Sequence, residues 1–415
     1  MRGWLYNRRV QGKLVFLLVR DGTGIVQAVG LRGELGEEKF GICTRLPQES
    51  ALEVTGTVRE DARSPGGVEI GLRDLRVIAE AAPDYPIQIQ DVVPEIGFLM
   101  RNRHLWLRSR KPAALLRLRA EVIRAVRDFL DGRGFVCLDA PILTPAACEG
   151  TTTLFPVDYF GDRAYLTQSG QLYAEAGAMA LGKVYCFGPT FRAEKSKTRK
   201  HLTEFWMVEP EAAFLELDGL MELAEQFVSA IVARCLDRCR EELKVLERDP
   251  RPLESVIPPF PRMHYTEAVR RVNENGVTME WGDDFGAPQE EALVRGIDRP
   301  VLVHRFPAEI KAFYMQPDPA DPRLALCVDM IAPEGYGEIV GGSQRIHDYR
   351  LLEERLARHG LPREAFEWYL DLRKYGSVPH SGFGLGIERT VAWVAGTEHI
   401  RECIPFPRML HKIYP

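Results

Sequence analysis

Hydrophobic and polar residues alternate along the first 80 residues, in short stretches separated by glycine, proline and Asp-Gly turns. The clearest stretches are residues 13–20, 24–29 and 51–58. Alternation with a period of two is typical of strands that bury one face. Residues 1–80 therefore predict a small β-barrel.

The pattern changes after this region. Residues 81–104 are rich in proline at their start, lack a helical period and predict a linker or hinge. In residues 113–133 the apolar side chains recur at helical spacing, up to the stop signals Gly132 and Gly134. A long helix is therefore expected to open a second domain, residues 105–415.

The second domain mixes predicted strands and helices without the regular βαβ rhythm of a doubly wound fold. A long helix is expected over 217–246, and short apolar runs predict strands at 184–187, 205–208, 301–304 and 324–328. This mixture favours an α+β domain on an antiparallel β-sheet with flanking helices. Residues 247–300, with several prolines before a shorter helix, are expected to form an insertion or lid-like segment.

Composition narrows the class of protein. The chain has 415 residues, of which 45% are hydrophobic, enough for two or three domains. No apolar run approaches the ~20 residues of a membrane span, and the N-terminus lacks a signal peptide's apolar core. We therefore expect a cytoplasmic protein with no membrane partner. The eight cysteines are scattered, which favours free thiols over disulfides or zinc.

The net charge of −5 does not indicate a nucleic-acid partner, but two segments are locally basic. Residues 1–20 and 98–119 carry several arginines and lysines and no acidic residue. A run of like charge is more often a solvated face than a binding site, so each segment needs support from its neighbours.

Two arginines indicate where chemistry takes place. Arg192 and Arg389 each end a short apolar, glycine-containing run that predicts a buried strand. An unpaired guanidinium is costly there, and its planar fork suits phosphate oxygens, so the two arginines suggest a triphosphate site. The alternative is a pair of buried structural ion pairs with Glu194 and Glu388.

Conventional nucleotide signatures are absent from the sequence. There is no Gly-x-x-x-x-Gly-Lys-Ser/Thr loop, and the glycines 382, 384 and 386 have the wrong spacing for a dinucleotide fingerprint. ATP would have to be held by arginines on neighbouring antiparallel strands, with the glycines giving a purine or phosphate access to the backbone.

Three segments together resemble the class II aminoacyl-tRNA synthetases. They are residues 134–145, the stretch from Phe191 to Phe205, and Gly382-Phe-Gly-Leu-Gly-Ile-Glu-Arg389, which match motifs 1, 2 and 3 (near 125–145, 184–211 and 382–396). The runs 167–174, 201–211, 341–347 and 404–408 resemble the asparaginyl members of the aspartate-like subgroup. The resemblance covers nearly the whole chain. It implies a class II catalytic domain and a five-stranded barrel of the oligonucleotide-binding (OB) type that binds the anticodon.

The resemblance also implies an ATP site. Arg192 would neutralise the α-phosphate, Glu194 and the ring of Phe205 would hold adenine, and Arg389 would hold the γ-phosphate end. His201 would add positive charge near the outgoing pyrophosphate, although a surface histidine is equally consistent with its sequence. Asp329 and Glu338 would bind Mg²⁺, a hard cation that prefers oxygen ligands.

The amino-acid pocket should separate asparaginyl from aspartyl enzymes. By resemblance Glu149, Ser169 and Gln171 would surround the substrate ammonium, and Arg345 would reach the side-chain oxygen. Aspartyl enzymes place a lysine where this chain has Ala174, so asparagine, which needs no counter-charge, is the expected substrate. The implied reaction forms asparaginyl-adenylate from L-asparagine and ATP, then transfers asparagine to the 3′-terminal adenosine of tRNA(Asn).

The same resemblance implies partners. Phe16 would stack on the middle anticodon base with Arg8 and Gln27 nearby, and the alternative is that Phe16 belongs to the barrel core. The family usually has a strand or short helix before the Gly3-Trp4 segment, so a clipped barrel is expected.

Motif 1 would form a homodimer interface through apolar residues, namely Phe135, Pro141, Ile142 and Leu143. Those residues could instead pack against the chain's own sheet. An aspartyl-tRNA synthetase, or a paralogue acting as an amide-forming enzyme or regulatory RNA-binding protein, remains the alternative function.

Overall fold

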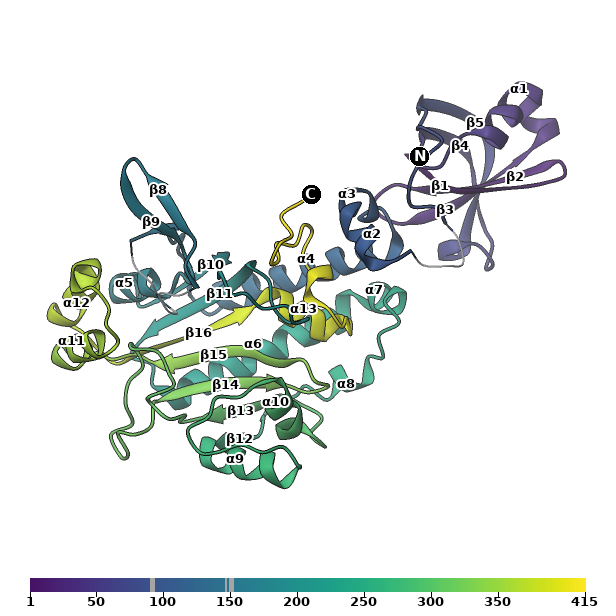
Figure 1. Ribbon diagram of the computed structural model, residues 1–415. Coiled ribbons are helices and arrows are strands. Elements are labelled where there is room, and N and C mark those ends of the chain that lie inside the picture. The colour runs from purple at the N-terminus through teal and green to yellow at the C-terminus, as the bar shows by residue number, and fades with distance from the viewer. Residues whose placement is uncertain (90–93, 146–147, 149–152) are drawn as a thin grey trace. The chain divides into compact units, whose positions relative to one another are not determined.

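The computed structural model describes residues 1–89, 94–145, 148 and 153–415 (Figure 1). These residues form two compact units, Met1–Trp106 and Leu107–Pro415. Glu149, expected near the substrate ammonium, lies outside the described residues. None of the helices in the described ranges is both long enough and apolar enough to cross a membrane.

The first unit contains the predicted barrel. Its strands close in the order β1-β2-β3-β5-β4 and are β1 (Arg2–Gln11), β2 (Leu14–Arg20), β3 (Ile25–Leu31), β4 (Ala51–Glu60) and β5 (Val68–Ala79). The expectation of a clipped barrel is wrong, because Arg2–Trp4 pair with Ala51–Glu53 and close it. Helix α1 (Arg32–Arg45) lies between β3 and β4, and α2 (Ile96–Arg101) and α3 (Arg103–Trp106) follow the barrel.

The second unit is built on an eight-stranded sheet in the order β12-β13-β14-β15-β16-β11-β10-β6. Its neighbouring strands are antiparallel except for the outermost pair at each end, β12–β13 and β10–β6. The strands are β6 (Val136–Cys137), β10 (Lys183–Phe191), β11 (Glu204–Ala213), β12 (Arg262–His264), β13 (Val301–His304), β14 (Cys327–Ala332), β15 (Gly337–Gln344) and β16 (His380–Gly386). A smaller sheet comprises β7 (Leu143–Thr144), β8 (Pro156–Tyr159) and β9 (Asp162–Leu166). The expected fold class is confirmed.

Helices cover one face of the large sheet. The long helices α4 (Arg110–Asp131) and α6 (Leu217–Arg238) and the later α13 (Ile387–Ala395) share one core with it. The single helix expected over 217–246 is interrupted at Cys239, and α7 (Arg240–Val245) follows. The remaining helices are α5 (Gln171–Leu181), α8 (Arg251–Glu254), α9 (Tyr265–Glu274), α10 (Ala287–Val294), α11 (Tyr349–Arg358) and α12 (Glu367–Lys374).

Residues 247–300 form part of the sheet's edge. They contribute β12 and the helices α8, α9 and α10, and several of their apolar residues form a core with β13 and β14. Asp284, Phe285 and Glu290 from this segment line a cavity over the sheet. The segment therefore helps to build the site described next.

Alternation along the central strands separates a structural face from an open face. Val208, Val340 and Leu385 lie in the core with α6, and Phe383 packs on Phe227 with ring centroids 5.5 Å apart. Their neighbours in sequence point to the other side of the sheet. These neighbours include glycines and charged residues, which mark the opposite face as a site rather than a second core.

Candidate active site

Two adjoining cavities lie on the open face of the sheet. The smaller has a volume of about 120 Å³ and the larger about 530 Å³. Arg192, Met207, Glu338 and Gly384 line both cavities, so the two form one continuous cleft.

Glycines on the sheet provide the space. A Cβ on Gly384 would collide with the Met207 methyl group, and one on Gly341 would lie 2.8 Å from Glu338 Oε1. Any side chain at these two positions would therefore fill the cleft or displace a lining residue. The sequence identified Gly384 as a point of backbone access, and its place in the cleft agrees with that hypothesis.

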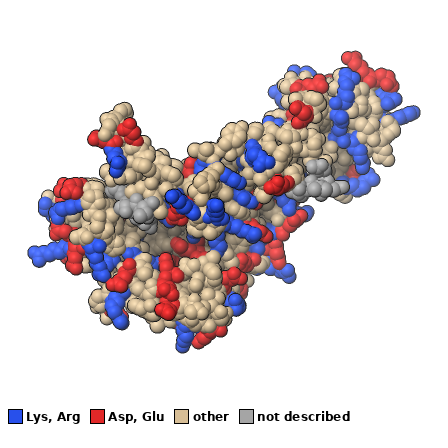
Figure 2. Space-filling model, viewed as in Figure 1, with Lys and Arg blue, Asp and Glu red and all other residues tan. Residues whose placement is uncertain are grey.

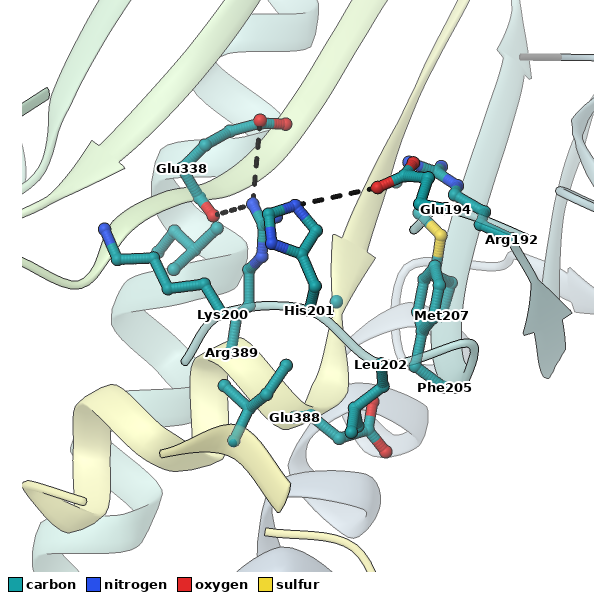
Figure 3. A pocket seen from close by; sticks show the side chains of 14 residues that line it. Arg192, Glu194, Lys200, His201, Leu202, Phe205, Met207, Glu338, Glu388 and Arg389 are labelled. Carbon is teal, nitrogen blue, oxygen red and sulfur yellow. Dashed lines mark hydrogen bonds and ion pairs between the residues drawn. The ribbon is translucent and has the colours of Figure 1, made fainter. Parts of the chain in front are cut away.

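All six predicted ATP-binding residues line the smaller cavity: Arg192, Glu194, His201, Phe205, Glu338 and Arg389 (Figure 3). The Arg192 guanidinium carbon lies 5.4 Å from the centre of the Phe205 ring, within the range of a cation–π contact. A planar base could share this ring. The cavity thus combines an aromatic face with cationic ends, which suits a nucleoside phosphate.

Arg389 and the neighbouring Glu388 contact different parts of the structure. Arg389 Nη1 donates to the Glu338 carbonyl oxygen at 2.8 Å and lies 3.7 Å from its carboxylate. Glu388 instead forms a buried ion pair with Arg119 of α4 at 2.7 Å and accepts the Trp206 N–H at 2.9 Å. The alternative of a buried structural ion pair therefore holds for Glu388, but its partner is Arg119 and not Arg389. Arg389 lines the cavity.

His201 lies in the cavity wall rather than on an open surface. Its Nε2 is 3.7 Å from Glu194 Oε2, and its Nδ1 is 3.2 Å from Ser196 Oγ. Burial and the nearby Arg389 lower the pKa of His201 below its usual value of 6.5, outweighing Glu194. The ring is therefore mainly neutral at pH 7, so it would donate a hydrogen bond to phosphate rather than the full charge expected from sequence.

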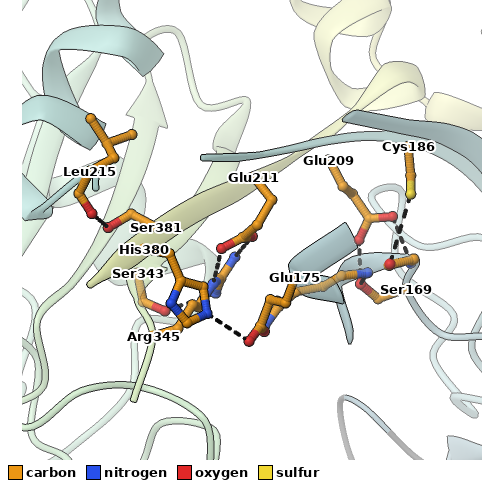
Figure 4. Close-up of polar contacts among 12 residues, drawn as sticks. Ser169, Glu175, Cys186, Glu209, Glu211, Leu215, Ser343, Arg345, His380 and Ser381 are labelled. Atoms are coloured by element: carbon orange, nitrogen blue, oxygen red, sulfur yellow. Dashed lines mark hydrogen bonds and ion pairs between the residues drawn. The ribbon is translucent and has the colours of Figure 1, made fainter. Parts of the chain in front are cut away.

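The larger cavity holds three of the predicted amino-acid residues: Ser169, Gln171 and Arg345. Glu209 of β11 orders the first of these, because it accepts the Ser169 hydroxyl and, at 2.8 Å, the Gly170 N–H (Figure 4). The Ser169 oxygen in turn accepts the Gln171 N–H at 3.0 Å. This turn places oxygen acceptors at the start of α5, where a cationic group could be bound.

Arg345 is fixed by a carboxylate that the sequence reasoning missed. Its Nη2 and Nε donate to Glu211 Oε2 and Oε1 at 2.9 and 3.1 Å, and both side chains are at most 3% exposed. Burial raises the pKa of Glu211 from its ordinary value, although Arg345 opposes the shift. Glu209 and Glu211 alternate with core residues along an otherwise apolar strand, and this alternation is the signal that could have revealed them.

Ala174 lies behind the cleft rather than in its wall. It is fully buried in a small apolar cluster with Ala178, Val184 and Cys186. Its proposed influence on specificity remains a prediction.

The two expected magnesium ligands approach each other across Gly341. A Cβ built on this glycine would lie 2.8 Å from Glu338 Oε1 and 3.6 Å from Asp329 Oδ1. Lys311 donates to Asp329 Oδ2 at 2.7 Å. Burial and Glu338 raise the pKa of Asp329 to about 7, against the effect of Lys311. No cluster of three or more His, Cys, Asp or Glu side chains forms a metal site in the described parts of the chain. Two converging carboxylates fit Mg²⁺ that is also held by phosphates.

In the barrel, Phe16 lies outside the core. Val15, Leu17 and Val19 of β2 are fully buried, whereas Phe16 is half-buried on the opposite face. Arg9 covers its ring at 4.8 Å. Arg8 points elsewhere and donates to the Leu46 carbonyl.

Gln27 is opposite Leu18 in the β2–β3 ladder, on the same face as Phe16, and donates to Ser64 Oγ at 3.1 Å. The structure thus brings Phe16 and Gln27 onto one face, with Arg9 in place of Arg8.

The second basic segment, residues 98–119, does not form a continuous basic surface. Arg119 is buried against Glu388, and Arg103 is 1% exposed over the Trp106 ring. On the visible face of the molecule, Lys and Arg are interspersed with Asp and Glu (Figure 2).

Comparison with known proteins places this site in a family. Residues 95–410 match the tRNA synthetases class II (D, K and N), and residues 1–78 match the OB-fold nucleic acid binding domain. The asparagine–tRNA ligases of Pelotomaculum thermopropionicum and Thermus thermophilus are each 57% identical, covering 100% of this chain and 96% of theirs.

Solved structures agree with this placement. The asparaginyl-tRNA synthetase of Pyrococcus horikoshii complexed with asparaginyl-adenylate is 46% identical, with a TM-score of 0.97 over 100% of this chain and 95% of that one. A putative aspartyl-tRNA synthetase of Leishmania major is more distant, at 25% identity and a TM-score of 0.88, over 100% and 91%. The chain belongs to the asparagine–tRNA ligase family of the class II tRNA synthetases.

Proposed function

We propose that the cleft carries out both steps of asparagine–tRNA ligation. The chain activates L-asparagine with ATP to asparaginyl-adenylate and transfers asparagine to the 3′-terminal adenosine of tRNA(Asn). The observation that carries this assignment to the site is Arg345, which lines the larger cavity and is paired with the buried Glu211, next to a smaller cavity with cationic ends. The larger cavity suits a neutral polar side chain, and the smaller cavity suits a triphosphate.

In the smaller cavity, Phe205 and Glu194 hold the adenine, with Arg192 at the α-phosphate and Arg389 at the γ-phosphate end. His201 donates a hydrogen bond to the departing pyrophosphate. Met207 and Gly384 shape the floor on which the nucleotide lies. These cations are already in place before the reaction. They can therefore stabilise the negative charge that develops in the transition state without reorganising.

In the larger cavity, Gln171 and Ser169 accept hydrogen bonds from the substrate ammonium. Arg345 donates to the side-chain oxygen of asparagine, and Glu211 accepts from its amide nitrogen. A pair of opposite charges leaves the pocket without an excess positive charge, so the amide finds both a donor and an acceptor. An aspartate carboxylate would face Glu211 and be repelled.

Mg²⁺ would be held by Asp329 and Glu338, and it would offset phosphate charge when bound. Lys311 holds Asp329 in place from the other side. Removing divalent metal with EDTA should abolish adenylate formation, and activity that survives chelation would argue against this site.

The chemistry needs no protein nucleophile. The asparagine carboxylate attacks the α-phosphorus, the bond from that phosphorus to the bridging oxygen breaks, and pyrophosphate leaves. The terminal 3′-hydroxyl of tRNA then attacks the adenylate carbonyl, and AMP leaves. The residues act by positioning and by offsetting charge.

The barrel would bind the anticodon through Phe16, Gln27 and Arg9, because the half-buried ring and the guanidinium over it are both flat groups on which a base can stack. A homodimer is also proposed. Phe135 is buried in the core, but Ile142 and Leu143 are 44% and 41% exposed and available for a partner. Ile142→Asp should shift the sedimentation coefficient to that of a monomer, and an unchanged value would oppose the interface.

The direct test is exchange of labelled pyrophosphate into ATP, with asparagine or aspartate and without tRNA. Exchange with asparagine alone is expected. Exchange with aspartate alone would overturn the substrate, and exchange with neither would favour a paralogue that no longer forms an adenylate.

A further inference from the structure

Behind the larger cavity lies a second layer of buried charge, centred on Glu175 of α5. This side chain is completely buried and has no place in the proposed chemistry. Its partners come from distant parts of the chain, namely Tyr369 and Arg373 on α12 and His380 at the start of β16. A carboxylate buried so deeply, with so many partners, needs a reason in fold or in function.

The contacts around Glu175 fix its position from three sides. Arg373 Nη2 donates to Oε2, the Tyr369 hydroxyl lies 2.8 Å from both oxygens, and His380 Nε2 lies 2.9 Å from Oε2. Burial alone would raise the pKa of Glu175, but Arg373 and His380 outweigh burial and lower it. The group is therefore an ionised carboxylate, which can only accept hydrogen bonds.

The remaining contact of Glu175 points towards the cleft. Gln171, one turn earlier on α5, donates its side-chain Nε2 to Glu175 Oε1 at 3.1 Å. Gln171 lines the larger cavity. Since a carboxylate cannot donate, it must face the amide nitrogen of Gln171, and this turns the amide oxygen away from Glu175.

We propose that Glu175 is a positioning residue for asparagine activation, which presents the Gln171 carbonyl oxygen to the substrate ammonium. The inference rests on the proposed function of the cleft, because it assigns the ammonium to Gln171. An amide free to rotate would present its NH₂ group part of the time, and that group repels a cation. Glu175 removes that option, and its own partners keep it from turning.

A purely structural role would have a different signature. If Glu175 only joined α5 to α12 and β16, its loss would weaken all ligands of the cleft alike. If it orients Gln171, the loss falls on ligands that carry an ammonium. Two non-hydrolysable adenylate analogues separate these cases: asparaginyl-sulfamoyl-adenosine and the same compound without its α-amino group.

The experiment compares inhibition constants of the two analogues for the wild type and Glu175→Gln. Glutamine keeps the volume but can turn either end of its amide towards Gln171. We expect binding of the amino compound to weaken about 10- to 100-fold, as for one lost hydrogen bond to a charged group. Binding of the deamino compound should change less than about threefold on the same scale. Equal weakening of both analogues, or of neither, overturns the proposal.

Tyr369→Phe is the matched control. It removes the hydroxyl contact with the same carboxylate, leaving the Gln171 contact in place. It should lower the melting temperature while keeping the wild-type ratio of the two inhibition constants, and a collapsed ratio would count against the proposal.

If Glu175→Gln fails to fold, a high-resolution structure of the wild type with the amino analogue decides the matter. Gln171 Oε1 should lie within hydrogen-bond distance of the ammonium while Nε2 stays on Glu175. A Gln171 side chain turned away from Glu175 would refute the proposal.

The wild-type exchange assay is done first, so that the two hypotheses can fail separately. No asparagine-dependent exchange in the wild type defeats the proposed function. Normal exchange, combined with equal losses for both analogues in Glu175→Gln, defeats only the positioning role.

Discussion

Glu211→Gln tests the basis of substrate selection. In the wild type, two hydrogen bonds of 2.9 and 3.1 Å tie Glu211 to Arg345, and both groups are buried. The substitution keeps the shape of the side chain and removes its charge. Arg345 is left with an uncompensated positive charge facing the position of the substrate side chain.

The magnitude follows from the burial of the pair. A carboxylate about 4 Å from a guanidinium gains about 4 kcal/mol at an effective dielectric constant of about 20, which corresponds to about a thousandfold. Asparagine loses an acceptor, worth about 1–3 kcal/mol. We expect the ratio of kcat/KM for asparagine over aspartate to decrease, relative to the wild type, by a factor of about 10 to 1000. Leaving a buried charge unpaired should also cost about 3–5 kcal/mol of unfolding free energy.

Pyrophosphate exchange with each amino acid measures the ratio, and thermal unfolding measures the stability. Glu225→Gln is the control, because Glu225 is a similarly buried acceptor, of the Phe260 N–H at 2.6 Å, on α6 on the covered side of the sheet. It should lower stability without changing selectivity. A folded Glu211→Gln variant with the wild-type ratio would refute the reasoning.

Gly384→Ala should weaken ATP binding, because the added Cβ meets the Met207 methyl group and displaces that flexible side chain in the cavity; wild-type affinity in equilibrium dialysis would contradict this. The pKa of His201 is lowered by burial and Arg389, so its ring gains a proton only below pH 6.5, and ATP should then bind more tightly. Proton NMR should show that ATP raises this midpoint, and an unmoved midpoint would remove His201 from the phosphates. Phe16→Ala should raise the KM for tRNA about tenfold, since a stacked base contributes about 1–3 kcal/mol, while exchange without tRNA stays normal; an unchanged KM would exclude stacking on Phe16.

Local patterns predicted most of the fold. Alternation located the strands β2, β3 and β4, and helical spacing located α4, because in each case one side of the element is buried. The predicted strand 324–328 is shifted in the structure to Cys327–Ala332, since its apolar run begins before the ladder does. The break at Cys239 has no glycine or proline to announce it, and only the backbone geometry reveals it.

The motif arginines of the site were visible in the sequence, whereas the buried carboxylates Glu211 and Glu175 were not assigned from it. Arg192 and Arg389 stand at the ends of apolar runs, where a charge is unexpected. Glu211 alternates with core residues of β11, and Glu175 lies within the mostly apolar α5, so the pattern marks the positions but does not show what they contact. Their burial depends on partners at Arg345 and Arg373, more than 130 positions away along the chain. Arg9 replaced Arg8 beside Phe16 for a similar reason, because a register shift in β1 between Leu5 and Asn7 decides which side chain faces the ring.

The buried charges at the amino-acid pocket and those in the layer behind it have a common explanation. Two carboxylates, Glu175 and Glu211, stand against two guanidiniums, Arg345 and Arg373, all of them buried. Apolar residues of similar volume would often be as stable or more stable, so stability alone does not explain this arrangement. A pocket for a neutral amide must offer a donor and an acceptor at fixed positions without a net charge, and paired ions held from behind provide both. Burying these charges therefore costs free energy at the pocket that distinguishes asparagine from aspartate. The apolar core on the other side of the sheet contributes the stability that offsets this cost.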